Sequence, residues 1–271
     1  MPELPEVETT RRGIEPWLVG RQIERLIVRQ WRLRWRVPRT LPARIRGATV
    51  RSVGRRAKYL LIDTDAGTLI WHLGMSGSLR VQDADSPPLA HDHVDLVLDS
   101  GRCLRFNDPR RFGSLLFTAA PPERHRLLSK LAAEPLSDAF DAGDLWRRAR
   151  GRKASIKTFI MDSRSVVGVG NIYASEALFR ARIPPGLAAG RVSRQRMAAL
   201  VAAIRAVLGE AIEVGGTTLR DYVDPAGMPG YFGRKLFVHE RRGKPCRRCG
   251  TPIRQFTQGS RSTYWCPDCQ R

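Results

Sequence analysis

Four cysteines near the C-terminus have the spacing of a metal site. They form two C-x2-C pairs, separated by sixteen residues: Cys246 with Cys249 and Cys266 with Cys269. Two such pairs supply the four thiolates of a tetrahedral Zn2+ site. Redox chemistry is the alternative for a C-x-x-C pair. This tail, however, is too small to bury a stable core unless a metal ion or another cross-link holds it together, which favours zinc. Because four protein thiolates leave no position for water, we expect one structural Zn2+ ion.

The N-terminus is unexpectedly acidic. The opening residues MPELPEVE contain three glutamates and two prolines, in a chain with 47 Lys+Arg and 26 Asp+Glu. Proline suits the first turn of a helix because its missing N–H would be unbonded there, and glutamate there complements the helix dipole. Val7, Ile14 and Leu18 would form the apolar face of this helix. Taken alone, the stretch predicts a helix start and no chemistry.

A second candidate site lies in VVGVGNIYASEALF, where two glycines precede Asn171 and an amphipathic run follows. One interpretation is an ordinary turn with Asn171 as the N-cap. The other is that backbone amides at the helix start bind a DNA phosphate, with Lys157 supporting the same phosphate. The residues alone leave both interpretations open.

The overall charge indicates a polyanionic partner. The formal net charge is +21 and the isoelectric point is about 11.1, so counterion release would favour binding to DNA or RNA. A hydrophobic content of 42% over 271 residues indicates a folded chain of more than one domain. No apolar run is long enough to span a membrane, and the N-terminus lacks the order of a signal peptide. We therefore expect a soluble, cytoplasmic protein with no membrane partner.

The elements that position these residues change in type along the chain. Eight short apolar segments between residues 23 and 118, punctuated by Gly, Asp or Pro, predict a β-sandwich or barrel. Helical patterns follow at 125–136, 144–151, 156–162, 171–183 and 194–214. Between the cysteine pairs we expect a β-hairpin with its tip near 258–262, where Arg261 would stand. The unpaired Cys103 is interpreted as a small buried apolar residue.

Several motifs, in order along the whole chain, resemble bacterial formamidopyrimidine-DNA glycosylases, the Fpg/MutM family. They are MPELPEVET, RRAKYL at 55–60, HLGMSGSLR at 72–80, HDHVDL at 91–96, NDPRRFG at 107–113, VVGVGNIYASE at 166–176, GGTTLRDY with PGYF within 215–232, and the four-cysteine hairpin. The resemblance implies an α+β protein: a β-sandwich with a leading helix at 1–120, a helix-two-turn-helix domain at 121–233, and a zinc β-hairpin at 234–271.

By the same resemblance, the protein is a bifunctional DNA glycosylase and AP lyase of base excision repair. It would excise oxidised purines, 8-oxoguanine and formamidopyrimidines, from double-stranded DNA. Removal of Met1 would make Pro2 the nucleophile; an α-amino group with a pKa of about 8 keeps a useful neutral fraction near neutral pH. Glu3 would be the general acid/base, and Glu6 would hold the amine and the helix start. Lys58 would assist β-elimination, and Arg261 would bind phosphate and assist δ-elimination.

The resemblance also assigns DNA contacts. Met75, Arg110 and Phe112 match the trio that fills the space left when the damaged base leaves the stack. By sequence alone, Met75 and Phe112 would instead be core residues. The matches to DNA-backbone contacts are His91, Arg152, Lys157 and Asn171.

Two alternatives remain at this stage. The endonuclease VIII group shares the proline nucleophile and a zinc hairpin but prefers oxidised pyrimidines, and a DNA-binding protein without catalysis would need only the charge and the cysteines. The segment 215–232 favours the purine-specific group because it resembles the loop that closes over flipped 8-oxoguanine. The family expectation is a monomer with no organic cofactor.

Overall fold

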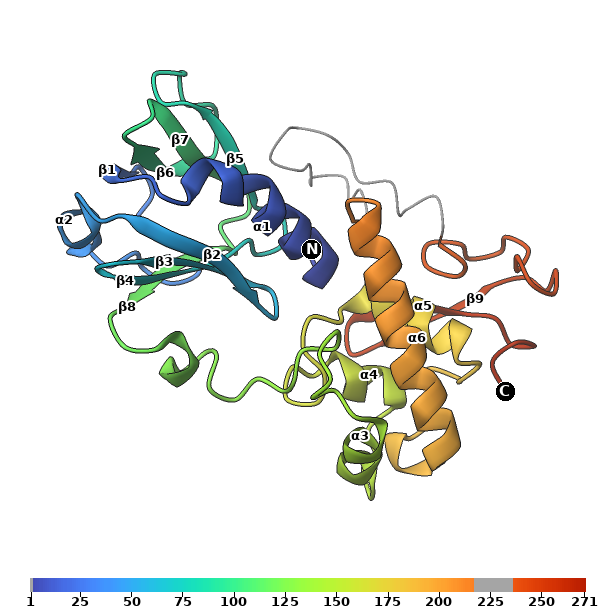
Figure 1. The fold of residues 1–271 in the computed structure, drawn as a ribbon. Coiled ribbons are helices and arrows are strands. Elements are labelled where there is room, and N and C mark those ends of the chain that lie inside the picture. The colour runs from blue at the N-terminus through green and yellow to red at the C-terminus, as the bar shows by residue number, and fades with distance from the viewer. Residues whose placement is uncertain (1, 217–235) are drawn as a thin grey trace. The chain divides into compact units, whose positions relative to one another are not determined.

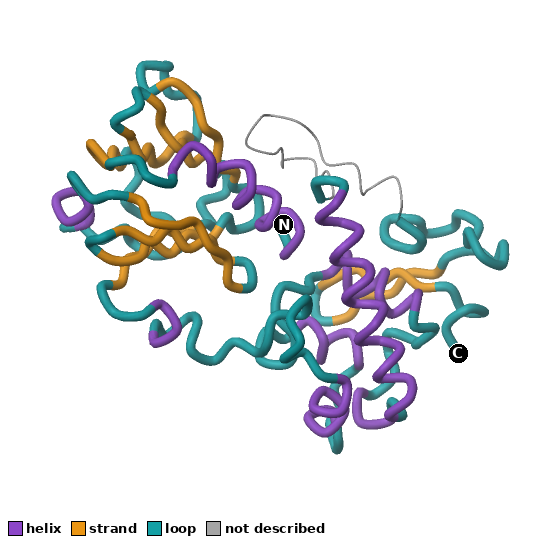
Figure 2. Tube along the Cα trace, in the orientation of Figure 1, coloured by secondary structure: helices purple, strands orange, loops and turns teal. Residues whose placement is uncertain are grey.

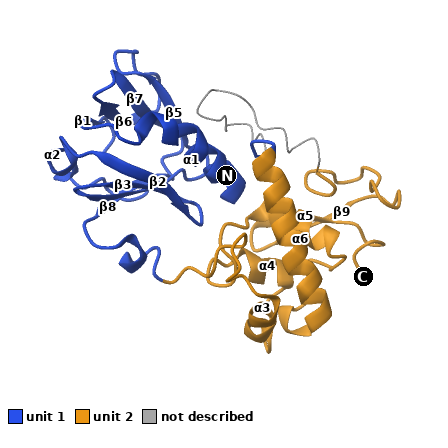
Figure 3. Cartoon of the chain, in the orientation of Figure 1, with its two compact units in different colours: residues 1–129, 214–231 blue, residues 130–213, 232–271 orange. Residues whose placement is uncertain are grey.

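The computed structural model describes residues 2–216 and 236–271 and divides into two compact units (Figure 1 and Figure 3). Unit 1 comprises residues 1–129 and 214–231, and unit 2 comprises residues 130–213 and 232–271. The predicted lesion-covering loop within 215–232 therefore lies, from residue 217 on, outside the described residues. Within the described ranges, no helix combines the length and hydrophobicity that a bilayer-spanning segment needs.

Unit 1 contains a β-sandwich, and all eight predicted strands are confirmed (Figure 2). One antiparallel sheet has the order β1-β6-β7-β5 and the other has the order β2-β3-β4-β8. The strands are β1 (Ile23–Val28), β2 (Val50–Arg56), β3 (Tyr59–Thr64), β4 (Gly67–His72), β5 (Ser78–Asp83), β6 (Asp92–Leu98), β7 (Arg102–Asn107) and β8 (Ser114–Thr118). A short helix, α2 (Leu41–Ile45), was not predicted.

The core of unit 1 lies between the two sheets. Along β3, alternate residues are buried, as expected for a strand with one face against a core. Trp71 of β4 meets Phe106 of β7 edge to face, with ring centroids 5.6 Å apart, so the two sheets are joined by aromatic packing. Cys103 is also fully buried, as predicted.

The leading helix, α1 (Leu4–Leu18), is confirmed, and it packs against β2, β3 and β5. Its predicted apolar face, Val7, Ile14 and Leu18, belongs to the same core cluster as the sandwich residues. Burial of this face explains why the helix forms although charged and polar residues make up much of its sequence, because tertiary packing supplies most of the stability of short helices.

Unit 2 combines helices with the C-terminal hairpin. The helices are α3 (Ala142–Ala149), α4 (Ile156–Met161), α5 (Asn171–Arg180) and α6 (Arg194–Glu213), and the strands are β9 (Arg254–Gln258) and β10 (Arg261–Trp265). Helix α5 packs against both α6 and β10, so it connects the helices with the hairpin. The predicted buried stripe of α6 is confirmed from Met197 to Ala211, whereas Ile212 is only partly buried.

One predicted helix is wrong. Residues 125–136 form turns and irregular structure, preceded by a single 3-10 turn, η1 (Pro122–Arg124). Only Leu128 and Pro135 of this segment are buried, and Leu136 is 42% exposed. A helix there would have no apolar face to pack, and Pro135 would interrupt its hydrogen bonds.

Candidate active site and nucleic-acid interface

The N-terminus of α1 is organised by two buried carboxylates. Glu3 is the N-cap, and Glu3 and Glu6 form a capping box in which each side chain accepts the other residue's backbone N–H. The Glu3 N–H donates to Glu6 Oε2 at 2.7 Å. Glu3 and Glu6 are 2% and 0% exposed, and these hydrogen bonds offset the cost of burying their polar groups. Pro2 directly precedes this rigid turn and is itself buried.

The second oxygen of Glu6 faces the backbone at Gly216. A Cβ added at Gly216 would lie 3.0 Å from Glu6 Oε1, and the φ of +82° is one that glycine adopts readily. One Glu6 oxygen therefore bonds to the N-terminal turn. The other oxygen lies beside Gly216, the last described residue before the segment 217–235.

Lys58 lies in the turn between β2 and β3 and is half-buried, so it is not the solvated strand lysine that local sequence suggests. Its charge acts on His72 at the end of β4. Burial, followed by the nearby charges of Lys58 and Arg34, lowers the pKa of His72 to about 4. His72 Nδ1 accepts the Gly74 N–H at 2.9 Å, so the neutral ring fixes the start of the loop that carries Met75.

Met75 and Phe112 lie at the surface, so their interpretation as core residues is wrong. Met75 is 40% exposed in the loop between β4 and β5, and Phe112 is 43% exposed in the loop between β7 and β8. The Arg110 guanidinium lies 5.0 Å from the centre of the Phe112 ring. The loops are in close contact because a Cβ at Gly74 would lie only 2.4 Å from the Gly113 nitrogen. The structure thus brings the predicted trio together.

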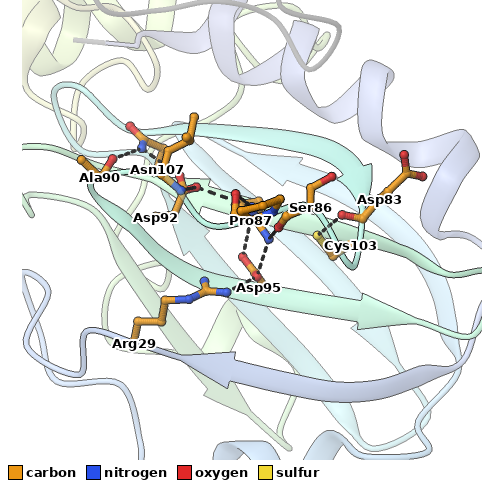
Figure 4. A network of polar contacts seen from close by, with 11 residues as sticks. Arg29, Asp83, Ser86, Pro87, Ala90, Asp92, Asp95, Cys103 and Asn107 are labelled. Atoms are coloured by element: carbon orange, nitrogen blue, oxygen red, sulfur yellow. Dashed lines mark hydrogen bonds and ion pairs between the residues drawn. The ribbon is translucent and has the colours of Figure 1, made fainter.

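His91 is exposed and has a positive φ of 71° at the entry to β6. The chain before it is held by side chains of the sheet (Figure 4). Asn107 Nδ2 donates to the Ala90 carbonyl at 2.9 Å and to Asp92 Oδ1 at 2.8 Å, while Asp92 Oδ2 accepts the Leu89 N–H at 2.7 Å. These bonds determine the direction in which the chain enters His91.

The loop preceding His91 is also held by Arg105 of β7, which is buried. Arg105 donates to both oxygens of Asp95, each at 2.9 Å, and to the carbonyls of Ser86 and Pro87 at 3.0 and 3.1 Å. Arg29 Nη2 completes the network at 2.6 Å from Asp95 Oδ2. Although burial opposes ionisation, the hydrogen bonds from the two arginines hold the pKa of Asp95 below its usual value.

In unit 2, Lys157 is buried and joins three elements. Its Nζ donates to Asn171 Oδ1 at 2.6 Å, to Thr263 Oγ1 at 2.8 Å and to the Ser262 carbonyl at 3.2 Å. Asn171 Nδ2 also donates to the Ser262 carbonyl, at 3.1 Å. Lys157 thus ties α4 to the start of α5 and to β10 of the hairpin.

The N-cap interpretation of Asn171 is wrong. Asn171 is the first residue of α5, and the N-cap is Gly170, which has no side chain to accept a hydrogen bond. The Asn171 amide is instead directed to Lys157 and Ser262, which lie far from it in sequence. Local sequence favours asparagine as a cap, but these tertiary contacts position it one residue inside the helix.

Arg261 and Lys157 line one cavity of about 240 Å³, together with residues of α4 and of the hairpin turn. Arg261 is exposed as the first residue of β10, next to the turn at Gly259 and Ser260, so the predicted hairpin tip is confirmed. Arg152 is also exposed, but it lies in the loop before α4 and does not line this cavity.

The four cysteines converge as their spacing predicts. Their sulfur atoms all lie within 4.8 Å of one another, with 3.4 Å between Cys249 and Cys266 and 3.9 Å between Cys246 and Cys269. Tetrahedral zinc with bonds of about 2.3 Å needs sulfur atoms about 3.8 Å apart, so the residues fit the ion. Gln270 supports the site by accepting the Cys266 N–H at 2.9 Å and donating to the Ile183 carbonyl at 2.8 Å.

Comparison with known proteins identifies the family. Successive stretches match the formamidopyrimidine-DNA glycosylase N-terminal domain (residues 1–115), the formamidopyrimidine-DNA glycosylase H2TH domain (131–223) and a zinc finger found in FPG and IleRS (243–271). Formamidopyrimidine-DNA glycosylases of Syntrophotalea carbinolica and Alkalilimnicola ehrlichii are 59% and 60% identical, with full coverage of each chain. The chain belongs to the formamidopyrimidine-DNA glycosylase family. The cysteine cluster is accordingly its zinc site.

Solved structures of the glycosylase family have the same fold as this chain. MutM (FPG) of Thermus thermophilus is 40% identical with a TM-score of 0.90, covering 99% of this chain and 98% of that one. Two complexes of Lactococcus lactis Fpg, one with Fapy-dG DNA and one with abasic-site DNA, are each 31% identical with a TM-score of 0.90. The first covers 99% of this chain and 100% of that chain, and the second 99% of both.

Sequence reasoning missed two residues that bond to the loops carrying Met75 and Phe112: His72 and Asp108. Both lie inside family motifs, and His72 bonds to the nearby Gly74 N–H. Asp108 is fully buried and bonds to Ser76, 32 residues away. The signal that could have found them was a polar residue directly at the end of an apolar strand, which often marks a residue with a specific partner.

The neutral state of His72 predicts a pH dependence of stability. The folded pKa is about 4 and the unfolded value is 6.5, so between these pH values the unfolded glycosylase binds more protons. The unfolding free energy should fall as the pH drops from 6.5 to 4, by up to about 3 kcal/mol from this residue. Urea unfolding of the wild type and of His72→Asn, which keeps an acceptor for the Gly74 N–H, checks this. An equal pH slope in both proteins would contradict it.

Proposed function

We propose that this protein is a bifunctional DNA glycosylase and AP lyase of base excision repair, acting on oxidised purines in double-stranded DNA. Its substrates are formamidopyrimidines and 8-oxoguanine opposite cytosine, and it acts as a monomer in the bacterial cytoplasm. The Lactococcus lactis relatives bound to Fapy-dG DNA and to abasic-site DNA support both the glycosylase and the lyase step. The observation that carries the proposal is Pro2 immediately before the buried capping box of Glu3 and Glu6.

The covalent step begins when Met1 is removed and the secondary amine of Pro2 becomes the chain terminus. Its nitrogen attacks C1′ of the damaged nucleotide, the bond from C1′ to the base breaks, and the base leaves with a proton. The C1′–O4′ bond then breaks, O4′ takes a proton from Glu3, and the opened sugar is joined to Pro2 as an iminium ion. Glu3 acts as general acid/base on the sugar, and a carboxylate beside the cationic iminium also stabilises it.

Strand cleavage follows from the iminium ion. Loss of a proton from C2′ expels the 3′ phosphate by β-elimination, and a second elimination expels the 5′ phosphate. Lys58 assists the first elimination, and Arg261 assists the second. Glu6 holds the turn on which Pro2 and Glu3 are carried, as its 2.7 Å bond from the Glu3 N–H supports.

DNA is bound through surfaces on each unit. On unit 1, the exposed Met75, Arg110 and Phe112 occupy the place of the extruded nucleotide, which would otherwise leave the stack open. On unit 2, Arg261, Asn171 and the charge of Lys157 act on phosphates, with Arg152 adding to the positive field. His91 contacts the backbone from unit 1. Zinc contributes structurally by holding the hairpin that presents Arg261.

Borohydride trapping tests this function. The enzyme is incubated with a duplex carrying 8-oxoguanine opposite cytosine, the iminium ion is reduced, and the cross-linked peptide is mapped. A cross-link on Pro2 is expected. A cross-link only with an oxidised-pyrimidine duplex would instead identify an endonuclease VIII-type specificity. Absence of a cross-link with either duplex, despite binding, would leave a DNA-binding protein without catalysis.

A further inference from the structure

Asp108 is a buried carboxylate at the junction of the loops that carry the proposed duplex-filling residues. It follows β7 directly and has no exposed surface. Asp108 Oδ1 accepts the Ser76 hydroxyl at 2.9 Å, and Asp108 Oδ2 accepts the Gly113 N–H at 2.7 Å. One carboxylate therefore bridges the loop between β4 and β5 and the loop between β7 and β8.

The backbone of Asp108 extends the same junction to a third loop. Its N–H donates to the His91 carbonyl at 3.0 Å, and its carbonyl lies 2.9 Å from His93 Nε2, which donates when that nitrogen carries the proton. The same carbonyl accepts the Arg111 N–H at 3.1 Å, which closes the turn that presents Arg110.

The bonded positions are the sequence neighbours of the residues proposed to enter the duplex. Ser76 follows Met75, Gly113 follows Phe112, and Arg110 lies within the turn that Asp108 begins. Met75 and Phe112 are 40% and 43% exposed, so the backbone on either side contributes strongly to where they point. A fully buried carboxylate with two short hydrogen bonds holds that backbone rigidly. If either bond broke, a buried donor would be left without an acceptor, which costs free energy.

The close approach of the two loops depends on the same contact. A Cβ at Gly113 would lie 3.1 Å from Asp108 Oδ2 and 2.5 Å from the Phe106 ring, so only glycine lets the backbone reach the carboxylate. A Cβ at Gly74 would meet the Gly113 nitrogen at 2.4 Å. The loops are therefore packed backbone against backbone, with Asp108 beneath them.

We propose that Asp108 is a positioning residue for base extrusion: it holds Met75, Arg110 and Phe112 as one preorganised wedge. This inference rests on the proposed function. It predicts that Asp108 matters most when a stacked base must be extruded and its place filled. At an abasic site there is no base to extrude, so elimination there depends much less on the wedge.

The test compares two single-turnover rates for each variant: excision of 8-oxoguanine opposite cytosine, and strand cleavage at a preformed abasic site opposite cytosine. Asp108→Ala is expected to lower excision roughly 30- to 100-fold, the order of loss that a misplaced site group produces, and to lower abasic-site cleavage less than about threefold. Ser76→Ala, which removes one of the two side-chain bonds, should lower excision by about three- to tenfold.

Asp108→Asn is the matched conservative variant. Its amide oxygen can accept the Gly113 N–H while its NH2 group donates to the Ser76 hydroxyl oxygen, so both bridges persist. Excision by Asp108→Asn should lie within about threefold of the wild type. Leu98→Ala controls for a general loss of stability, because Leu98 is fully buried and lies at the end of β6 opposite the His91 end.

The outcomes separate the inference from the proposed function. If the wild type cleaves neither substrate, the proposed function fails. If it cleaves both, and Asp108→Ala loses the two activities equally or only as much as Leu98→Ala, then Asp108 merely stabilises the fold and the inference is overturned. If Asp108→Ala does not fold, Ser76→Ala decides: an unchanged excision rate in that variant also overturns it.

Discussion

Replacing Pro2 with glycine, or inserting one residue between Met1 and Pro2, is expected to lower excision of 8-oxoguanine by roughly a thousandfold or more. The insertion converts the proline nitrogen into an amide, whose lone pair is delocalised and cannot attack C1′. Glycine retains a primary amine but loses the rigid ring that holds the nitrogen next to the Glu3 and Glu6 turn. Single-turnover assays with gel-resolved products measure the loss.

The affinity of these variants for the same duplex should change by less than about threefold, because the phosphate contacts are elsewhere. Pro5→Ala is the matched control: it removes a proline from the same helical turn while keeping the terminal amine, and it should remain close to wild type. Mass spectrometry establishes whether Met1 is present in each preparation. Normal turnover by protein that retains Met1 would exclude Pro2 as the nucleophile.

The second large effect is expected from the zinc site. Cys249→Ala should eliminate bound zinc and weaken binding to a lesion duplex by about a hundredfold, because several cationic contacts are lost together. The hairpin shares only a small core with α5, in which Cys246 and Cys266 pack with Phe179, Val238 and Ile253. Without the metal, this core cannot hold Arg261 and the Ser262 and Thr263 oxygens that Lys157 binds.

Zinc content by elemental analysis and affinity by fluorescence anisotropy test this expectation. Cys103→Ala is the control, since the fifth cysteine is buried in the sandwich of unit 1 and is not a zinc ligand. It should keep both the metal and the affinity. Zinc loss in Cys249→Ala with unchanged affinity would mean that DNA binding does not depend on the hairpin.

Elements with local sequence signals were predicted well. All eight strands and the helix at 194–213 were found, because alternation and a helical stripe are visible within one segment. The helix predicted at 125–136 failed for the opposite reason: its apolar residues match a helical period, but most of them have no neighbouring element to pack against. A pattern can state which face is apolar, but it cannot state whether something covers that face.

The sequence by itself determined the chemistry that depends on residues close together in the chain. The cysteine pairs predict zinc because each pair already has the spacing of two ligands. Family resemblance added the expected roles of Pro2, Glu3, Glu6, Lys58, Arg261 and the DNA-contacting residues, but not their surroundings.

Only the tertiary structure decided where the remaining side chains lie. It exposes Phe112 and Met75, buries Lys157 against oxygens more than a hundred residues away, and joins residues 76, 91 and 113 through Asp108. The physical reason is that burial and hydrogen bonding depend on which loops lie next to one another at the edge of the sandwich. The pairing of strands that are distant in sequence determines which loops those are.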